Sequence, residues 1–311
     1  MDALVALVRS FPANFPHPVL VVLHVSPSGT SVLPAILDRA SRLTVRSPAH
    51  GDALLAGHVY VAPPDSHLIV EDSHLHLSQA PRENGHRPAI DPTMRSAAQA
   101  YRDGAIGIVL SGSRDDGTAG LLEIKAGGGI AIVQDPDEAL YAAMPRSALA
   151  HVDVDAVLRI ADIVPWILQR AGDVTPAESE EWMSSPSSAD EPGQTAAGFG
   201  TRFTCPDCGG VLFERHEGAL DRFECSVGHV FSIESLASAQ GNALENALWA
   251  AVRSLEDRAA LLQRMRDRAR ASERPRSAEA FETQAEQALD RARTIREAVE
   301  NISAGGLAAA E

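Results

Sequence analysis

The 311-residue sequence contains a single lysine, Lys125, and only three cysteines, and aromatic residues make up just 5% of it. Its 42 acidic residues outnumber 27 basic ones, which gives a formal net charge of −15 at pH 7. A chain of that sign repels a phosphate backbone, so we expect no nucleic-acid partner. No apolar run approaches the ~20 residues that a membrane-spanning helix needs, so we also expect no membrane insertion.

The low cysteine count excludes a further class of protein. Three cysteines, two of them in a Cys-x-x-Cys pair, do not resemble the disulfide framework of a small secreted domain. A charged segment followed by a short apolar run, the pattern of a secretory leader, is not visible at the start of the chain. We therefore expect a protein of the reducing cytoplasm.

The apolar residues that are present suffice for a sizeable core, since 45% of the chain is hydrophobic. Over residues 1–170, short apolar runs alternate with helical patterns. This alternation predicts an α/β fold with a doubly wound, mostly parallel sheet, and two alternating runs around Asp72-Ser73 predict an inserted β-hairpin. The expected strands are residues 19–23, 59–64, 67–71, 74–78, 105–110 and 129–135, and the expected helices are 2–11, 31–40, 93–103, 118–125, 144–149 and 157–170.

Two polar residues lie at the predicted carboxyl ends of buried strands. His24 follows the run Val19–Leu23, and Asp116 lies in the Gly-rich turn after residues 105–110. Open α/β sheets bind ligands at this edge, and the irregular polar loop 81–92 is of the kind that borders a site. Each residue also has a simpler interpretation, because such a histidine is often structural and an Asp before Gly-Thr is a common helix cap.

Residues 171–200 differ from the segments on either side. They contain six acidic residues and no basic ones, among many Ser, Pro, Ala and Gly residues. This composition predicts a disordered acidic linker, so we expect only a loose coupling between residues 1–170 and the rest of the chain.

The segment after the linker has the spacing of a metal site. Cys205 and Cys208 form a C-x2-C pair, and after sixteen intervening residues Cys225 and His229 form a C-x3-H pair. Two such knuckles that face each other across a tetrahedral ion are typical of a zinc ribbon, which we predict over residues 201–233. Because four protein ligands leave no open position, the zinc would be structural.

Alternatives to the zinc ribbon remain open at this stage. The cysteines could be buried without a metal, and a redox role for the Cys-x-x-Cys pair is less favoured because no thioredoxin-like unit surrounds it. His216 could replace His229 as the fourth ligand, but it falls in the predicted hairpin turn, away from both knuckles.

Residues 234–304 have a helical pattern that Pro275 interrupts. The pattern predicts a helical hairpin or a coiled-coil arm. Acidic and basic residues nearly balance over residues 251–300. A solvated helix pair and a partner-binding arm therefore remain equal alternatives.

Five segments of residues 1–170 resemble, in the right order, the catalytic domain of the chemotaxis protein-glutamate methylesterases (CheB-type). They are Val19–His24 with the following Ser-Pro-x-Gly, Gly57–Asp65, His86–Asp91, Leu110–Gly120 and Met144–Arg146. The resemblance implies a Ser-His-Asp esterase without a catalytic cofactor, in which His24 is the general base and Asp116 orients it. It implies as partners a methylated chemoreceptor or similar signalling protein, and a methyltransferase or receiver protein of the same pathway.

The sequence departs from this family pattern in two places. It carries Ser113-Arg114 where family members often have Met-Gly, in a turn that bears on the oxyanion hole. Residues 1–311 also lack both the Gly-x-Ser-x-Gly-Gly turn that holds the nucleophile and an N-terminal receiver domain of the kind that many members have.

Three hypotheses accommodate the missing nucleophile turn. In the first, the chain is an esterase whose serine is encoded upstream of Met1, and we expect the reading frame to continue there because the helix 2–11 has no capping residue before it. In the second, it is a catalytically dead signalling scaffold of the same fold, in which the ribbon and helical arm are the working parts. In the third, Ser26, Ser28 or Ser111 is the nucleophile, which is less favoured because none lies in a tight Gly-flanked elbow.

Overall fold

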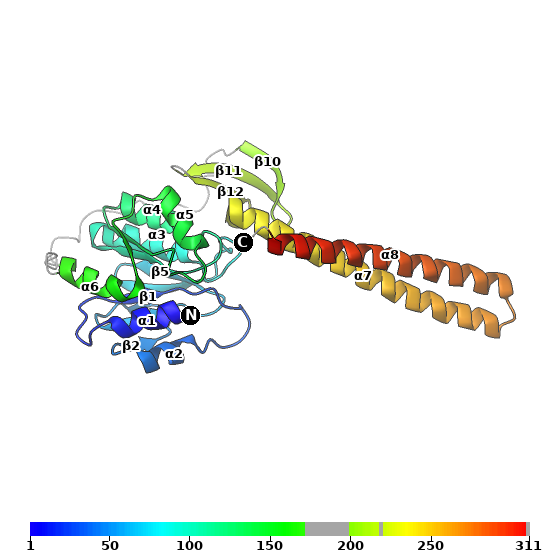
Figure 1. Ribbon diagram of the computed structural model, residues 1–311, viewed down its shortest axis with the longest axis horizontal. Helices are drawn as coiled ribbons and strands as arrows, with labels where there is room; N and C mark the ends of the chain where they lie inside the picture. Colours follow the sequence, from blue (N-terminus) through cyan, green and yellow to red (C-terminus); the bar gives the residue numbers. More distant parts are fainter. Residues whose placement is uncertain (172–198, 218–219, 309–311) are drawn as a thin grey trace. The chain divides into compact units, whose positions relative to one another are not determined.

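The computed structural model describes residues 1–171, 199–217 and 220–308 (Figure 1). The chain divides into two compact units, Met1–Leu236 and Ala237–Glu311. Almost all of the predicted linker 171–200 lies outside the described residues, so its predicted disorder remains a prediction. Among the described helices, none combines the length and the apolar character that crossing a membrane requires.

The amino-terminal part of the first unit alternates strands and helices (Figure 1). Its helices are α1 Asp2–Ser10, α2 Leu33–Ala40, α3 Ile90–Tyr101, α4 Thr118–Ala126, α5 Ala143–His151 and α6 Ile160–Ala171. Its strands are β1 Val19–Val21, β2 Thr44–Arg46, β3 Asp52–Ala53, β4 His58–Val61, β5 His67–Glu71, β6 His74–Ser78, β7 Ile106–Val109, β8 Ile130–Gln134 and β9 Ala156–Leu158.

These strands form two parallel sheets and one antiparallel sheet. The parallel sheets have the orders β1-β4-β2 and β7-β8-β9, and the antiparallel sheet has the order β3-β6-β5. Strands β5 and β6 are the predicted hairpin, and both residues of its turn, Asp72 and Ser73, have positive φ, as a tight two-residue turn requires. The predicted α/β class with an inserted hairpin is confirmed.

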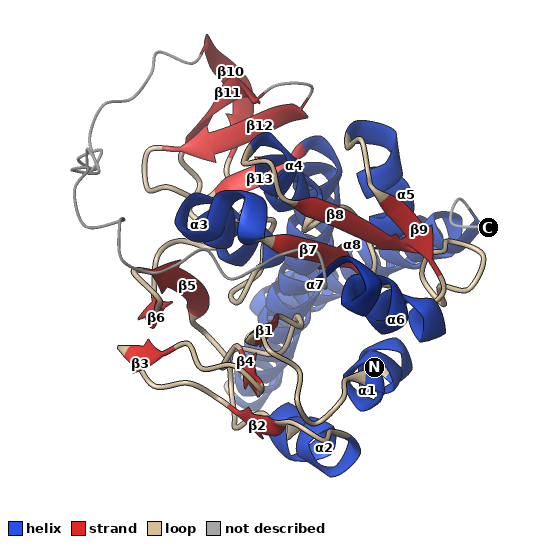
Figure 2. Cartoon of the chain, turned by 90° about the vertical axis from the view of Figure 1, so that its left-hand side faces the viewer, coloured by secondary structure: helices blue, strands red, loops and turns tan. Residues whose placement is uncertain are grey.

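Strand β8 shows how the two faces of a sheet are covered. Ala131 and Val133 are buried with residues of α4 and α5, whereas Ile132 is buried with residues of α1 and α6. Helices therefore lie on both sides of the strands β7, β8 and β9 (Figure 2). Because both faces of such a strand are buried, its sequence is a continuous apolar run, which is the pattern that predicted it.

Several predicted boundaries are wrong, and strands β2 and β3 lie where no strand was predicted. Two of the boundary errors have a clear physical reason. The helix expected over residues 157–170 begins only at Ile160, because residues 156–158 form β9, which pairs with β8 and is too short to show a period of two. The helix expected over residues 93–103 begins earlier, at Ile90, and includes Pro92 in its first turn. Proline is tolerated there because a first-turn amide has no partner within the helix.

The carboxyl-terminal region begins with a four-stranded antiparallel sheet, ordered β10-β11-β12-β13. Its strands are β10 Phe199–Thr204, β11 Val211–Glu217, β12 Leu220–Cys225 and β13 Val230–Ser232. We refer to residues 199–232 as the ribbon. The ribbon belongs to the same compact unit as the α/β part, so the expected loose coupling between them is wrong.

Helices α7 Ile233–Ala271 and α8 Pro275–Ala308 follow the ribbon and confirm the predicted helical hairpin. Pro275 begins α8, a position where its missing amide costs nothing. The buried residues of α8 include Ala278, Ala285, Ala292 and Val299, which are seven residues apart. Such a repeat is the seam of a coiled coil, here made narrow by small side chains.

Candidate active site and candidate metal centre

His24 and Asp116 meet at the edge of the parallel strands. The Nε2 atom of His24 lies 2.6 Å from Oδ2 of Asp116, although 92 residues separate them in the sequence. The side chain of His24 is 24% exposed and that of Asp116 only 2%. The structure therefore places a solvent-accessible imidazole on a buried carboxylate.

Asp116 accepts several hydrogen bonds besides the one to His24. The backbone amides of Ile90 and Asp91 donate to it at 2.7 and 3.3 Å, and the side-chain amide of Asn84 donates at 3.1 Å. Burial opposes ionisation of Asp116, but the hydrogen bond and charge of His24, with these donors, lower its pKa to about 2. The side chain of Asp116 thus accepts hydrogen bonds from the first turn of α3, and it does not cap α4, the helix that follows Asp116 in the sequence.

The ionised state of Asp116 settles the tautomer of His24. A carboxylate with a pKa of about 2 only accepts hydrogen bonds at neutral pH, so Nε2 of the neutral imidazole must carry the proton. The lone pair is then on Nδ1. This arrangement makes Nδ1 the atom of His24 that can act as a base.

Asp91 is a second buried carboxylate beside Asp116. Its Oδ1 accepts hydrogen bonds from the backbone amides of Gly117 and Gly120 at 2.9 and 2.8 Å, and its Oδ2 accepts one from Asn84 at 2.9 Å. Burial, and then the charge of Asp116, raise the pKa of Asp91 to about 7. Through these hydrogen bonds Asp91 links the start of α4 to the candidate active site.

His86 packs face to face on His24. The ring centroids are 3.8 Å apart and the ring planes differ by 5°. Burial, and then His24, lower the pKa of His86 to about 4, so His86 is neutral at neutral pH. Nη1 of Arg114 lies 3.4 Å from Nε2 of His86. His86 thus supports one face of the candidate base without competing with it for a proton.

Sequence reasoning did not assign roles to Asn84, His86 and Asp91. The signals that could have found them are the predicted polar loop 81–92 and the segment His86–Asp91 that carries part of the family resemblance. The neighbouring Asp115 is buried, and the structure records no contact between it and His24.

The three serines considered as nucleophiles are bonded elsewhere. The hydroxyls of Ser26 and Ser28 lie 3.1 Å from each other, and the hydroxyl of Ser111 accepts the amide of Tyr141 at 3.0 Å. Within the described part of the chain, no serine hydrogen-bonds to His24. The third hypothesis therefore has no support in this geometry.

The four predicted metal ligands form one cluster at the end of the ribbon. The ligand atoms of Cys205, Cys208, Cys225 and His229 all lie within 4.8 Å of one another. His216 does not join them; it lies on β11 and contacts Asp221 at 2.6 Å. The structure therefore groups the four residues that the spacing predicted.

The distances within this cluster suit a tetrahedral ion. The sulfurs of Cys208 and Cys225 are 3.6 Å apart, and Nδ1 of His229 lies 3.5 Å from the sulfur of Cys225. Zinc–sulfur bonds of about 2.3 Å place two sulfur ligands about 3.8 Å apart around a tetrahedral zinc. Both knuckles turn at a glycine of positive φ, Gly209 and Gly228, where a side chain would be strained.

Comparison with known proteins gives consistent results for the amino-terminal half. Residues 1–167 match the family described as CheB methylesterase. The protein-glutamate methylesterase/protein-glutamine glutaminase 2 of Anaeromyxobacter dehalogenans is 38% identical over 161 residues, which are 52% of this chain and 47% of that protein. A Leptospira interrogans protein, provisionally named for the same two activities, is 35% identical over 164 residues, which are 52% of this chain and 85% of that protein.

A solved structure is similar over the same region. The crystal structure of the Thermotoga maritima CheB methylesterase catalytic domain matches with a TM-score of 0.52 and 32% identity, covering 54% of this chain and 91% of that one. This chain thus spans nearly all of an isolated catalytic domain, but about half the length of the Anaeromyxobacter relative.

Proposed function

The chain belongs to the CheB methylesterase family, and from that premise we propose that it hydrolyses glutamyl methyl esters on a chemoreceptor or similar signalling protein. The observation that carries the proposal is the 2.6 Å contact between Nε2 of His24 and Oδ2 of Asp116. A methyltransferase would supply the methyl esters, and a receiver protein of the same pathway is a further proposed partner.

The proposed reaction uses His24 twice as a base and twice as an acid. Nδ1 of His24 takes the proton of a serine hydroxyl as the serine oxygen attacks the ester carbonyl, and the proton then passes to the departing methoxide, which leaves as methanol. Nδ1 next takes a proton from water as the water oxygen attacks the acyl-serine ester. That proton returns to the serine oxygen, and a glutamate side chain is released. Asp116 stabilises the imidazolium that forms in each step.

The nucleophilic serine is proposed to lie outside residues 1–311. The Gly-x-Ser-x-Gly-Gly turn of the family is absent from this sequence, and the nearby serines Ser26, Ser28 and Ser111 bond to other groups. The genomic sequence upstream of Met1 tests this point. An in-frame Gly-x-Ser-x-Gly-Gly codon run within about sixty nucleotides supports the esterase. An in-frame stop codon directly before Met1 would favour the dead scaffold.

The activity itself is tested with the gene product that includes any upstream segment. We expect it to release labelled methanol from a chemoreceptor whose glutamyl side chains carry labelled methyl groups, and we expect the His24→Ala variant to release almost none. Equal release by the two proteins would refute the role of His24.

The Cys205, Cys208, Cys225 and His229 cluster is proposed to hold one structural zinc ion. The donor set and the distances of about 3.5 to 3.6 Å between neighbouring ligand atoms support this proposal. When bound, the ion would cross-link the two knuckles and supply much of the folding energy of so small a sheet. Metal analysis of protein purified under reducing conditions should find about one zinc per chain.

A further inference from the structure

The ribbon packs against the loop that supports the His24–Asp116 pair. The carbonyl of Val230, in β13, accepts the amide of Asn84 at 2.8 Å, and the amide of Val230 donates to the carbonyl of Arg82 at 3.3 Å. Val230 also forms a parallel bridge with Glu83. The last strand of the ribbon thus continues as a backbone ladder onto residues 82–84.

The side chain of Asn84 connects the ribbon to both buried carboxylates. Its Nδ2 donates to Asp116 and Asp91, while its Oδ1 accepts hydrogen bonds from the amide of Ser232 and the hydroxyl of Ser235, both at 3.1 Å. Asn84 is 2% exposed, so no water replaces a lost partner easily. The orientation of this amide, and with it one donor to Asp116, therefore depends on residues 232 and 235.

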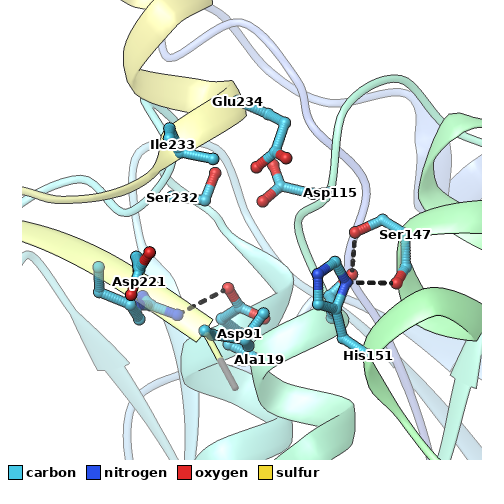
Figure 3. Close-up of a pocket in the computed structure, with 12 residues that line it drawn as sticks. Asp91, Asp115, Ala119, Ser147, His151, Asp221, Ser232, Ile233 and Glu234 are labelled. Atoms are coloured by element: carbon cyan, nitrogen blue, oxygen red, sulfur yellow. Dashed lines mark hydrogen bonds and ion pairs between the residues drawn. The ribbon is translucent and has the colours of Figure 1, made fainter. Parts of the chain in front are cut away.

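Arg222 reaches the same network from β12. Nη1 of this buried residue lies 3.4 Å from Oδ2 of Asp91, and its Nη2 lies 3.6 Å from Oε1 of Glu83. The dashed line to Asp91 in Figure 3 marks the first of these contacts. Two carboxylates buried side by side repel each other, and a guanidinium beside them offsets that repulsion.

The interface between the ribbon and the α/β part leaves two spaces around these polar groups. One, of about 110 Å³, is lined by Asp91 and Asp115 of the α/β part and by Ser232 and Glu234 (Figure 3). The other, of about 320 Å³, lies between Glu83 and Arg95 and the ribbon residues Arg215, Arg222, Glu224 and Val230. The contact lies within the compact unit Met1–Leu236, and its spaces can hold water beside the polar side chains.

Two of the four metal-ligand residues lie at the turn that joins the strands of this contact. Cys225 ends β12, His229 immediately precedes β13, and the two strands pair so that Arg222 lies opposite Ser232. An ion that joins Cys225 to His229 closes the turn between these strands. A bound ion would thereby hold the register that presents Arg222 and Ser232 to the α/β part.

We propose that Arg222, Ser232 and Ser235 are positioning residues, which hold Asp116 and His24 in place through Asn84 and Asp91. Binding of the metal ion to the ribbon then stabilises the His24–Asp116 pair. The ion itself takes no part in the reaction. The proposal deepens the proposed function and rests on it for its kinetic consequences. Its structural consequence, the order of the His24–Asp116 hydrogen bond, is measurable without activity.

The first test uses nuclear magnetic resonance of residues 1–311 with labelled histidine. We expect a downfield, exchange-protected Nε2 proton that is absent from His24→Ala. Ser235→Ala and Arg222→Met should broaden or abolish it, whereas Arg202→Met, at an exposed arginine of the same ribbon, should leave it unchanged. Removal of zinc by a chelator should abolish the signal and added zinc should restore it.

Zinc content is measured for each variant, because Arg222→Met could unfold the ribbon. Ser235 lies outside the ribbon and its metal cluster, in the first turn of α7, so Ser235→Ala tests the contact with the metal retained. A signal that survives in Ser235→Ala, or in the protein stripped of metal, would overturn the proposal.

The kinetic test separates this proposal from the proposed function. In the active gene product, Arg222→Met should lower kcat by about ten- to a hundredfold with KM little changed, as loss of an outer-shell partner does. If His24→Ala abolishes hydrolysis while Arg222→Met equals Arg202→Met, only the positioning role fails. If His24→Ala leaves hydrolysis unchanged, the proposed function fails.

Discussion

Asp91 lies in the first turn of α3 and Asp116 lies just before α4, and each of the two accepts hydrogen bonds from the start of the other one's helix. Asp116 bonds the amides of Ile90 and Asp91 in the first turn of α3, and Asp91 bonds the amides of Gly117 and Gly120 at the start of α4. The amino-terminal ends of both helices carry partial positive charge, which stabilises buried carboxylates. The exchange explains how two acidic side chains are buried together beside His24.

This exchange requires close approach of α3 and α4, so Gly120→Ala should destabilise the protein. A Cβ at residue 120 would lie 2.6 Å from Cβ of Met94 and 3.1 Å from Cα of Asp91. We expect a loss of about 1–3 kcal/mol in the free energy of unfolding, measured by urea denaturation. Gly104→Ala is the control, because its Cβ would meet only Cβ of Tyr101, at 4.0 Å. Equal stabilities of the two variants would contradict the tight contact.

The two adjacent acids of the turn after β7 should differ in their effect on hydrolysis. In the active gene product, Asp116→Ala and His24→Ala should each lower the rate by about four to six powers of ten, because the triad acts as a unit. Asp115→Ala should cost far less, since Asp116 is the acid that contacts His24. Circular dichroism checks that each variant is folded. If Asp115→Ala nearly abolished hydrolysis while Asp116→Ala lowered the rate only slightly, the roles of the two acids would be assigned in the wrong order.

The proposed zinc site predicts which histidine matters for the metal. Cys208→Ser and His229→Ala should lose zinc and unfold the ribbon, as measured by metal analysis and limited proteolysis. His216→Ala, the matched histidine of the same sheet, should keep its zinc. The α/β core should remain folded in all three variants, since its main core cluster contains no ribbon residue. Zinc that is lost from His216→Ala and retained by His229→Ala would reverse the ligand assignment.

His86 should make the fold sensitive to acid. Burial, and then His24, lower its pKa from an ordinary 6.5 to about 4, so its contribution to stability is present above pH 6.5 and is lost as the pH falls towards 4. His86→Phe keeps a ring that can stack on His24 and removes the titration. Urea denaturation between pH 7 and pH 4.5 should therefore show a smaller loss of stability for His86→Phe than for the natural protein.

The comparison between His86→Phe and the natural protein separates the effect of His86 on the pH dependence of stability from the effect of Asp91. Burial, and then the charge of Asp116, raise the pKa of Asp91 to about 7, so its contribution to stability is largest at low pH and is lost as the pH rises through 7, the opposite sign. Both proteins share that contribution. His17→Phe, at an exposed histidine, should behave as the natural protein does. Identical slopes for His86→Phe and the natural protein would contradict the assigned protonation of His86.

Sequence alone determined those parts of the protein that depend on local patterns. Continuous apolar runs such as Ile130-Ala131-Ile132-Val133 predicted strands covered on both faces, and the Asp72-Ser73 turn predicted the hairpin. The position of His24 and Asp116 directly after such runs predicted a shared edge. The cysteine spacing predicted the cluster, because both knuckles are short segments whose geometry is local.

Only the tertiary structure decided what surrounds the candidate active site. Arg222 and Asp91 are 131 residues apart, and Ser235 and Asn84 are 151 apart, with no periodicity that relates them. A buried polar group is stable only where all of its partners converge, and that convergence depends on the packing of several elements at once. The acidic composition of residues 171–200 suggested that the parts on either side of it are independent. The contacts of the ribbon with residues 82–84 and Asp91 show instead that the ribbon belongs to the unit that holds His24. Composition could not predict those contacts, because they depend on side chains that are distant in the sequence.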